Sequence, residues 1–170
     1  MKKIFLASLF LVSAVCFSTA QAQSPKLGHI NSAELMRAMP ETDSAEIQIQ
    51  KYGHELENNI KTMQTELEKK YMEFQNNANQ MSDLIKQTKQ KELQDMQVRM
   101  EEFGKQADED YKSKQQALLE PIIDKAKKAI QAVAKENKFT YVFDTSGGVL
   151  IYTEDSDNLM ALVKKKLGLK

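Results

Sequence analysis

The sequence has little of what catalysis and covalent stabilisation require. Its 170 residues include one cysteine, two histidines and no tryptophan. Cys16 lies in an N-terminal segment that we expect to be removed, so the remaining chain has no disulfide and no thiolate nucleophile. His29 and His54 lie on different predicted elements, and we expect them to be solvated or packed rather than metal-bound. Because the sequence also offers no nucleophile–base set, we predict that the protein is not an enzyme and needs no cofactor.

Signals for phosphate or nucleic-acid binding are also scarce. The segment 144–148, DTSGG, has some likeness to an aspartic-protease or phosphate-loop pattern, but it lacks a lysine and a following helix. The turn of a β-hairpin explains it better. The 24 basic and 24 acidic side chains balance, which gives no indication of nucleic acid as a partner. Aromatic residues make up only 7% of the chain, which indicates a small globular core.

The first 22 residues have the pattern of a cleaved signal peptide. Two lysines precede an apolar run at 4–17, and the small-x-small sequence Ala-Gln-Ala follows at 20–22. The apolar run is shorter than a membrane-spanning helix needs to be. We therefore predict cleavage between Ala22 and Gln23 and an exported product with a net charge of −2.

One alternative is a lipoprotein anchored through Cys16. The preceding residues 13–15, Ser-Ala-Val, fit a lipid-attachment site badly, because such sites have leucine first and a small residue last. We therefore prefer the soluble, cleaved product.

Two stripes of apolar residues dominate the middle of the chain. Both stripes step by three and four residues, which is typical of one face of a helix. They predict two long antiparallel helices, at about 41–77 and 82–137, with the tip at 77–83. The first helix would be ~55 Å long at ~1.5 Å per residue. The narrow stripes favour a projecting helical hairpin over the alternative, a compact bundle of three or four helices.

Three residues interrupt these helices. Gly53 and Gly104 would lie within about one turn of each other in the hairpin, and each is unfavourable in a helix interior. They predict either a hinge in the arm or a close approach of the two helices. Pro121 cannot donate to the helical hydrogen bonds and should kink the second helix where the arm meets the body.

The segments on either side of the hairpin predict a small body. Residues 26–31 form a strand candidate, and Asn31 with Glu34 resembles a capping box for a short helix that ends before Pro40. Thr42 and Asp43 are candidate N-caps of the first long helix. After the second long helix, residues 139–153 predict two strands around a Ser-Gly-Gly turn, and a last helix is expected at about 157–167. An isolated two-stranded hairpin is marginally stable, so this one needs a partner.

Methionines are frequent on the predicted arm. Met63, Met96 and Met100 fall on the apolar stripes, where we expect them to pack in the seam, the line of contact between the two long helices. Other apolar residues fall off the stripes or near the tip, and methionine is common at surfaces that accept many partners. The candidates for contact with a partner are Met72, Met81, Leu84, Ile85 and Val98.

The order of these elements resembles the Skp/OmpH family of periplasmic outer-membrane-protein chaperones. The resemblance is carried by KLGHINSAELMRAMPET at 26–42 and by the segment 121–168, which begins PIIDKAKK and ends VKKKLG. It implies a mainly α fold in which a coiled-coil-like arm (41–120) projects from a small β body (23–40 and 121–170). The resemblance further implies that three chains share this body, burying Leu27, Ile30, Val142, Phe143, Leu150 and Ile151.

The resemblance also implies a function. Family members hold unfolded outer-membrane proteins in a cavity between three arms, without ATP, before membrane insertion. It therefore implies a periplasmic homotrimer whose contact with a membrane is at most transient. The competing interpretation is a trimeric spacer or adaptor that presents its arms to one fixed partner.

One feature departs from the family. The best-known members are strongly basic, and their basic residues are credited with lipopolysaccharide or client attraction. Here the helix at 41–77 has four lysines against eight acidic residues, and only the tip region, with Lys86, Lys89 and Lys91, is positive. The sequence therefore does not predict lipopolysaccharide binding, and it indicates weaker steering of acidic clients.

Overall fold

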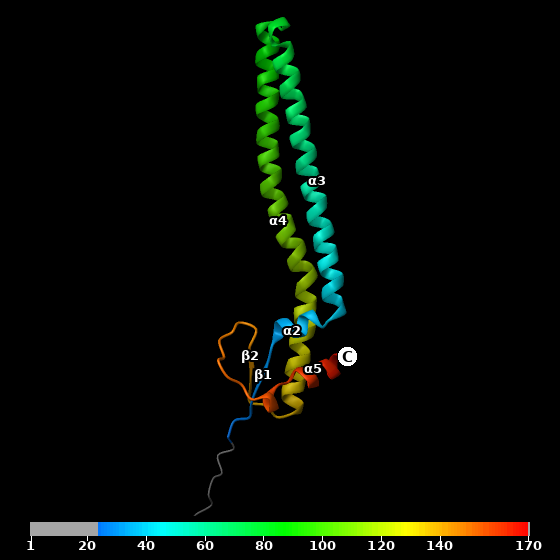
Figure 1. The fold of residues 1–170 in the computed structure, drawn as a ribbon, viewed down its shortest axis with the longest axis vertical. Coiled ribbons are helices and arrows are strands. Elements are labelled where there is room, and N and C mark those ends of the chain that lie inside the picture. The colour runs from blue at the N-terminus through cyan, green and yellow to red at the C-terminus, as the bar shows by residue number, and fades with distance from the viewer. Residues whose placement is uncertain (1–23, 170) are drawn as a thin grey trace, which may run out of the picture.

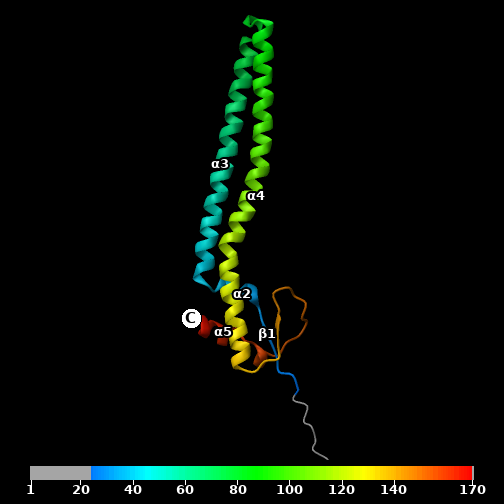
Figure 2. The ribbon, with the colours of Figure 1, turned by 180° about the vertical axis from the view of Figure 1, so that it is seen from behind.

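The computed structural model describes residues 24–169 and consists of a long helical arm on a small body (Figure 1). The predicted signal peptide, Cys16 and the cleavage site at Ala22 and Gln23 lie outside the described residues. The arm is formed by α3 (Pro40–Asn77) and most of α4 (Asp83–Glu136), joined by a 3-10 turn at Ala78–Gln80. Seen from both sides, the two helices run side by side and antiparallel (Figures 1 and 2). The predicted helical hairpin and its tip are thus confirmed.

The first long helix begins earlier than predicted. Its N-cap is Met39, and Pro40 occupies the first turn, where a missing N–H costs nothing and the fixed φ suits the helix. Thr42 is not a cap: it is buried, and its hydroxyl donates to the carbonyl of Met36 at 2.6 Å. Its hydroxyl therefore satisfies a carbonyl at the end of the preceding helix. The N-cap predictions at Thr42 and Asp43 are therefore wrong, because both residues lie inside α3, which begins at Pro40.

The body joins both ends of the described chain. It contains β1 (Leu27–Ile30), α2 (Ser32–Arg37), β2 (Tyr141–Asp144), a 3-10 turn (Asp155–Asp157) and α5 (Met160–Leu167), packed on the last part of α4. The Asn31 half of the predicted capping box is present, because the Asn31 side chain accepts from the Glu34 N–H at 3.0 Å. The core gathers apolar side chains from β1, α2, α4 and α5 and from Val142 of β2. Its almost fully buried members are Ile30, Leu35, Met39, Val133, Leu159 and Val163.

The sheet differs from the prediction. β1 and β2 pair in parallel, with Leu27 opposite Tyr141 and Ile30 opposite Asp144. The other edge of β1 meets the chain at Asn158, and Leu159 N–H donates to the His29 carbonyl at 2.9 Å. Residues 149–153 form no strand, so the predicted β-hairpin is wrong in this single chain. A second hairpin strand would lie on the outer edge of a two-stranded sheet, with nothing in the described chain to cover it.

The last helix, α5, is present, and local hydrogen bonds and a glycine mark its two ends. Asn158 accepts from the Met160 N–H at 2.9 Å, and Gly168 ends the helix with a φ of 72°. The helix begins at Met160, three residues later than expected, because Asp155–Asp157 forms a 3-10 turn.

Pro121 lies inside an α4 that is continuous from Asp83 to Glu136. The buried residues of α4 that belong to the body core begin at the next position, Ile122.

Candidate functional site

The arm carries isolated apolar side chains on a polar surface. Four of the five predicted contact residues, Met72, Leu84, Ile85 and Val98, are exposed large hydrophobic residues. Met81 differs from them, because it is partly buried and lines a small hollow at the tip with Phe74 and Leu93. The structure brings Leu84 and Ile85 together at the tip and leaves Met72 and Val98 farther down the arm. Whether they contact a client stays a prediction.

Two further exposed apolar residues on the arm were missed by the sequence analysis. Ile47 lies two residues before Ile49, where the first apolar stripe starts, and is exposed. Tyr71 lies on that stripe and is nevertheless half exposed. The regular spacing of the stripe places Tyr71 in the contact between the helices and does not show how much of its ring is covered. The narrow contact between two helices covers only part of so large a ring. The seam methionines Met63 and Met96 do line one small hollow between the helices.

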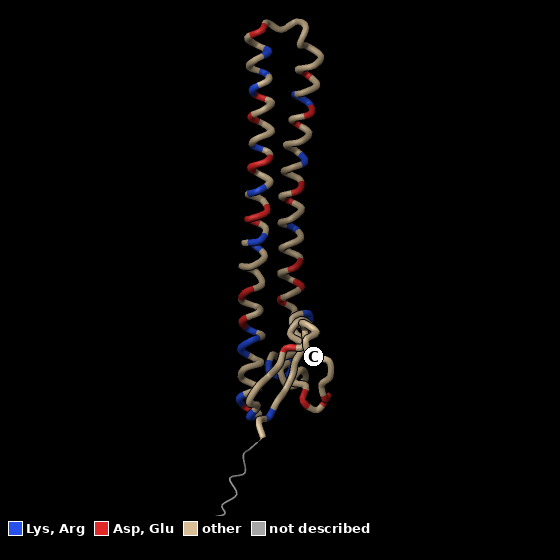
Figure 3. Tube along the Cα trace, turned by 90° about the vertical axis from the view of Figure 1, so that its left-hand side faces the viewer, with Lys and Arg blue, Asp and Glu red and all other residues tan. Residues whose placement is uncertain are grey.

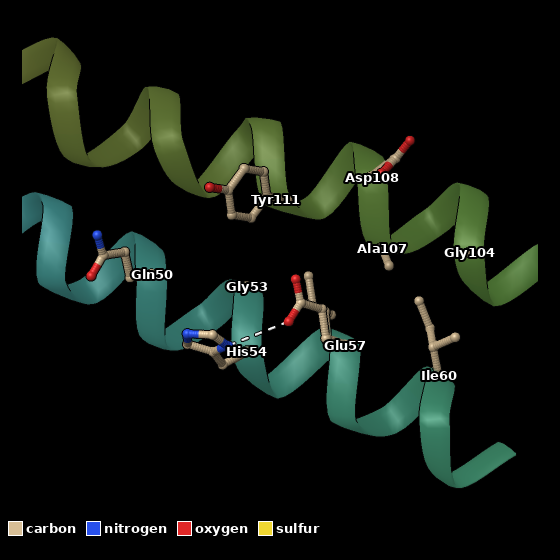
Figure 4. A pocket seen from close by; sticks show the side chains of 10 residues that line it. Gln50, Gly53, His54, Glu57, Ile60, Gly104, Ala107, Asp108 and Tyr111 are labelled. Carbon is tan, nitrogen blue, oxygen red and sulfur yellow. Dashed lines mark ion pairs between the residues drawn. The ribbon is translucent and has the colours of Figure 1, made fainter. Parts of the chain in front are cut away.

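A larger hollow lies between the helices at the level of the two arm glycines (Figure 4). It has a volume of about 380 Å³ and is lined by residues of both α3 and α4, including Gly53 and Gly104. A Cβ atom added at Gly53 would lie 3.2 Å from Cε2 of Tyr111, which is a close approach. A Cβ atom at Gly104 would meet no described atom within 4 Å. The two glycines therefore share one level, as predicted, but only Gly53 is closely packed; a hinge stays a prediction.

The residues expected in a shared trimer core divide between the two faces of the sheet. Ile30 is 2% exposed, and Ile30 and Val142 pack into the core of their own chain. Leu27 and Phe143 lie on the opposite face and are 45% and 43% exposed. Leu150 and Ile151 lie in the segment that forms no strand, and Ile151 is fully exposed. A single chain thus leaves one apolar face of its sheet uncovered.

This uncovered face borders a hollow of about 290 Å³. Leu27, Phe143, Leu150 and Tyr152 line it together with His29. The His29 side chain is buried, and its Nε2 lies 3.0 Å from the Glu154 carbonyl oxygen. The hydrogen bond holds the segment after residue 153 against β1. His54 lies far away on the arm, with Nδ1 3.3 Å from a carboxylate oxygen of Glu57.

Asp144 is the carboxylate with the most hydrogen bonds in the body. Its Oδ1 accepts from the backbone N–H groups of Ser32 and Ser146, and its Oδ2 accepts from the Ser32 hydroxyl at 2.5 Å. Partial burial raises the pKa of Asp144, but these hydrogen bonds outweigh burial and lower the pKa from 3.8 to about 2. The charged carboxylate thus fastens the end of β2 to the start of α2.

Charges are distributed unevenly along the molecule (Figure 3). The arm helix α3 has the acidic excess noted above. Lys125, Lys127 and Lys128 lie close together in the part of α4 whose buried residues belong to the body core. Lys125 forms an ion pair with Glu41 at the start of α3. Within residues 24–169, no group of three histidine, cysteine or acidic residues has the geometry to hold a metal ion. In the same range, no helix is long and apolar enough to cross a membrane.

The sequence and the fold were compared with those of known proteins. No curated protein matches the sequence. A solved structure with a similar fold is described as an OmpH-like outer membrane chaperone from Caulobacter crescentus. Its TM-score is 0.74 at 11% sequence identity, and the match covers 85% of this chain and 84% of that chain. The family model of the OmpH-like outer membrane proteins matches residues 26–167. The chain therefore belongs to the OmpH-like family.

Proposed function

We propose that the protein is an ATP-independent holdase chaperone that binds unfolded outer-membrane proteins and prevents their aggregation. One observation carries this proposal: the arm stands free of the core and displays scattered exposed apolar side chains, such as Met72, Leu84 and Val98, on a polar surface. Single apolar contacts of this kind are individually weak, so a client can be shielded along its length and still be released. The chaperone described for the similar Caulobacter structure supports the same role.

The second part of the proposal is a homotrimer. The exposed face of the sheet, with Leu27, Phe143, Leu150 and Ile151, is the surface that copies of the chain would cover. Subunits that share a core are a usual solution where one chain cannot bury enough apolar surface. In a trimer, the segment 149–153 would find the neighbouring strand that it lacks in a single chain. Three arms would then extend from one body and enclose the client.

The third part is the location. An exported chain with a cleaved signal peptide at 1–22 would work in the periplasm, where ATP is not available to drive release. A holdase of this kind needs no nucleotide, because the client leaves when the outer membrane offers its apolar strands a better environment. Contact with the membrane would be transient.

Native mass spectrometry tests the proposal. The chain from Gln23 onward is measured alone and after a urea-unfolded β-barrel membrane protein is diluted into it, and light scattering follows client aggregation. We expect a trimer that gains one client and suppresses the scattering. A trimer that ignores the client would contradict the holdase and favour a spacer or adaptor with a fixed partner. A monomer would contradict the shared body.

A further inference from the structure

The hollow at the level of Gly53 and Gly104 results from small residues in the seam. Elsewhere along the arm the seam has larger side chains, such as Leu93, Met63 and Met96, and the hollows that they line are smaller, about 180 Å³ and 110 Å³. Here Gly104 and Ala107 face α3 from one side and Gly53 faces α4 from the other (Figure 4). A Cβ atom at Gly104 would be free of contacts with the described chain within 4 Å. The space is therefore unfilled rather than closed by a tight approach of the helices.

The walls of the hollow have a defined chemistry. The Tyr111 ring points from α4 toward Gly53 and forms a flat aromatic wall, and Ile60 adds an aliphatic one (Figure 4). Glu57 points from α3 toward α4, and Asp108 lies at the outer edge. Neither lysine nor arginine is among the described residues that line the hollow. His54 also lines the hollow, and its Nδ1 lies 3.3 Å from a carboxylate oxygen of Glu57 (Figure 4). The hollow is thus apolar and aromatic inside, and its border has the carboxylates of Glu57, which pairs with His54, and of Asp108.

The volume of the hollow and the charge at its border together indicate which chemical group it can bind. A volume of about 380 Å³ lies within the ~300–1,000 Å³ range of pockets that bind small organic groups. An aromatic side chain fits a narrow space beside another ring, because offset aromatic pairs are favourable. The acidic border complements a lysine or arginine two residues from that aromatic residue, on the same side of an extended segment. Transmembrane β-barrels carry girdles of aromatic residues, so clients of the proposed class contain such side chains.

We propose that this hollow is a binding site for an aromatic side chain that has a lysine or arginine two residues away in an extended client segment, where both side chains lie on the same side. The inference rests on the proposed holdase function and adds to it a specific anchor on each arm. The aromatic side chain enters between Gly53 and Gly104 against the Tyr111 ring, and the cation lies near Glu57. The remaining arm contacts stay weak and non-specific.

The test uses the whole mature chain and two short peptides, acetyl-Lys-Thr-Trp-Thr-Lys-amide and acetyl-Glu-Thr-Trp-Thr-Glu-amide. Because the protein contains no tryptophan, tryptophan fluorescence reports only the peptide. We expect saturable binding of the lysine peptide and binding of the glutamate peptide that is weaker by about tenfold or more. Gly104→Leu places a side chain in the hollow and should weaken binding of the lysine peptide by about tenfold or more. Gly104→Ala changes the same residue without filling the hollow and should bind as the wild type does.

A second variant addresses the charge without changing the seam. Glu57→Gln should reduce the preference for the lysine peptide over the glutamate peptide and leave the helical circular dichroism unchanged. The inference is overturned if wild-type protein does not bind the lysine peptide, if Gly104→Leu binds it as well as Gly104→Ala, or if both peptides bind equally.

The same proteins are also tested for suppression of client aggregation, which separates the two proposals. Protection of the client by wild type together with equal peptide binding by both Gly104 variants would overturn the anchor and leave the holdase standing. Peptide binding that depends on Gly104, without any protection of the client, would overturn the holdase and leave the site standing.

Discussion

At the scale of single residues, Asp144 connects parts of the chain that are far apart in sequence. Its partner Ser32 is 112 residues away, and the carboxylate meets both the backbone N–H and the hydroxyl of that serine. Ser32 is the first residue of α2, where a negative charge is favourable to the helix. Asp144 also orders the turn that follows β2 through the Ser146 N–H. The Asp144 side chain thus connects the end of β2, the first residue of α2 and the turn that follows β2.

We predict that Asp144→Asn destabilises the body by about 1 kcal/mol at neutral pH, because charge-assisted hydrogen bonds are replaced by weaker ones at a partly solvated position. Folding lowers the pKa of Asp144 from 3.8 to about 2. Its contribution to stability is therefore complete above pH 3.8 and is lost as the pH falls through about 2. Urea unfolding as a function of pH should show this acid-dependent loss in wild type and less of it in Asp144→Asn.

The matched control for this experiment is Asp95→Asn on the arm. Within the described residues, the Asp95 side chain forms no ion pair or hydrogen bond. Its replacement should leave both the stability and its pH dependence close to those of wild type. Equal acid profiles for wild type and Asp144→Asn would contradict the role of Asp144.

At the scale of elements, the arm could be predicted closely and the sheet could not. All four ends of the two long helices were expected within one residue of their observed positions. Apolar spacing, weak helix formers at the tip and end signals are all local, so they can be identified in the sequence. The partner of β2 is not local: a segment as short as Tyr141–Asp144 has no signal that selects β1 in parallel.

The same distinction holds for the candidate sites. The common level of Gly53 and Gly104 followed from counting residues on either side of the tip. The unfilled space beside Gly104 did not, because it depends on the direction of the Tyr111 ring. Likewise, the residues expected in a shared core were identified as apolar, but only the register of β1 and β2 divides them into a buried and an exposed face.

We predict different outcomes for alanine at the two arm glycines. Gly104→Ala should stabilise the arm by about 0.8–1 kcal/mol, because alanine is the better helix former and its Cβ meets no described atom within 4 Å. Gly53→Ala should gain less or nothing, because its Cβ would lie 3.2 Å from the Tyr111 ring and displace it. Amide hydrogen exchange along 100–111 measures both effects. Equal stabilisation by the two variants would contradict the packing described for Gly53.

At the scale of the whole molecule, one apolar face remains to be covered. The body has a well-packed core on one side of its sheet and exposed apolar residues on the other. An exposed apolar surface of this kind marks an interaction site in a soluble protein. The arm, in contrast, has only isolated apolar side chains, which suit transient contacts. Assembly and client binding are therefore assigned to opposite ends of the molecule in the proposed function.

We predict that the double substitution Leu27→Asp with Phe143→Asp converts the proposed trimer into monomers. Both side chains are about half exposed in a single chain, so the body itself should remain folded, whereas two buried charges per subunit would oppose assembly. Native mass spectrometry and circular dichroism measure the two properties. Ile47→Asp, at an exposed apolar position on the arm, is the control and should leave the oligomeric state unchanged. A double variant that assembles like wild type would contradict this interface.

The parallel pairing of β1 with β2 also sets an order of events during synthesis. β1 emerges early, yet its partner follows only after the entire arm has been made. Closing a loop of more than a hundred residues is entropically costly, but the antiparallel arm brings the two ends together as it forms. Local helical contacts also form faster than non-local strand pairs. We therefore expect the arm to form before β1 and β2 pair, so that a chain stalled before residue 141 has a helical arm and an unpaired first strand.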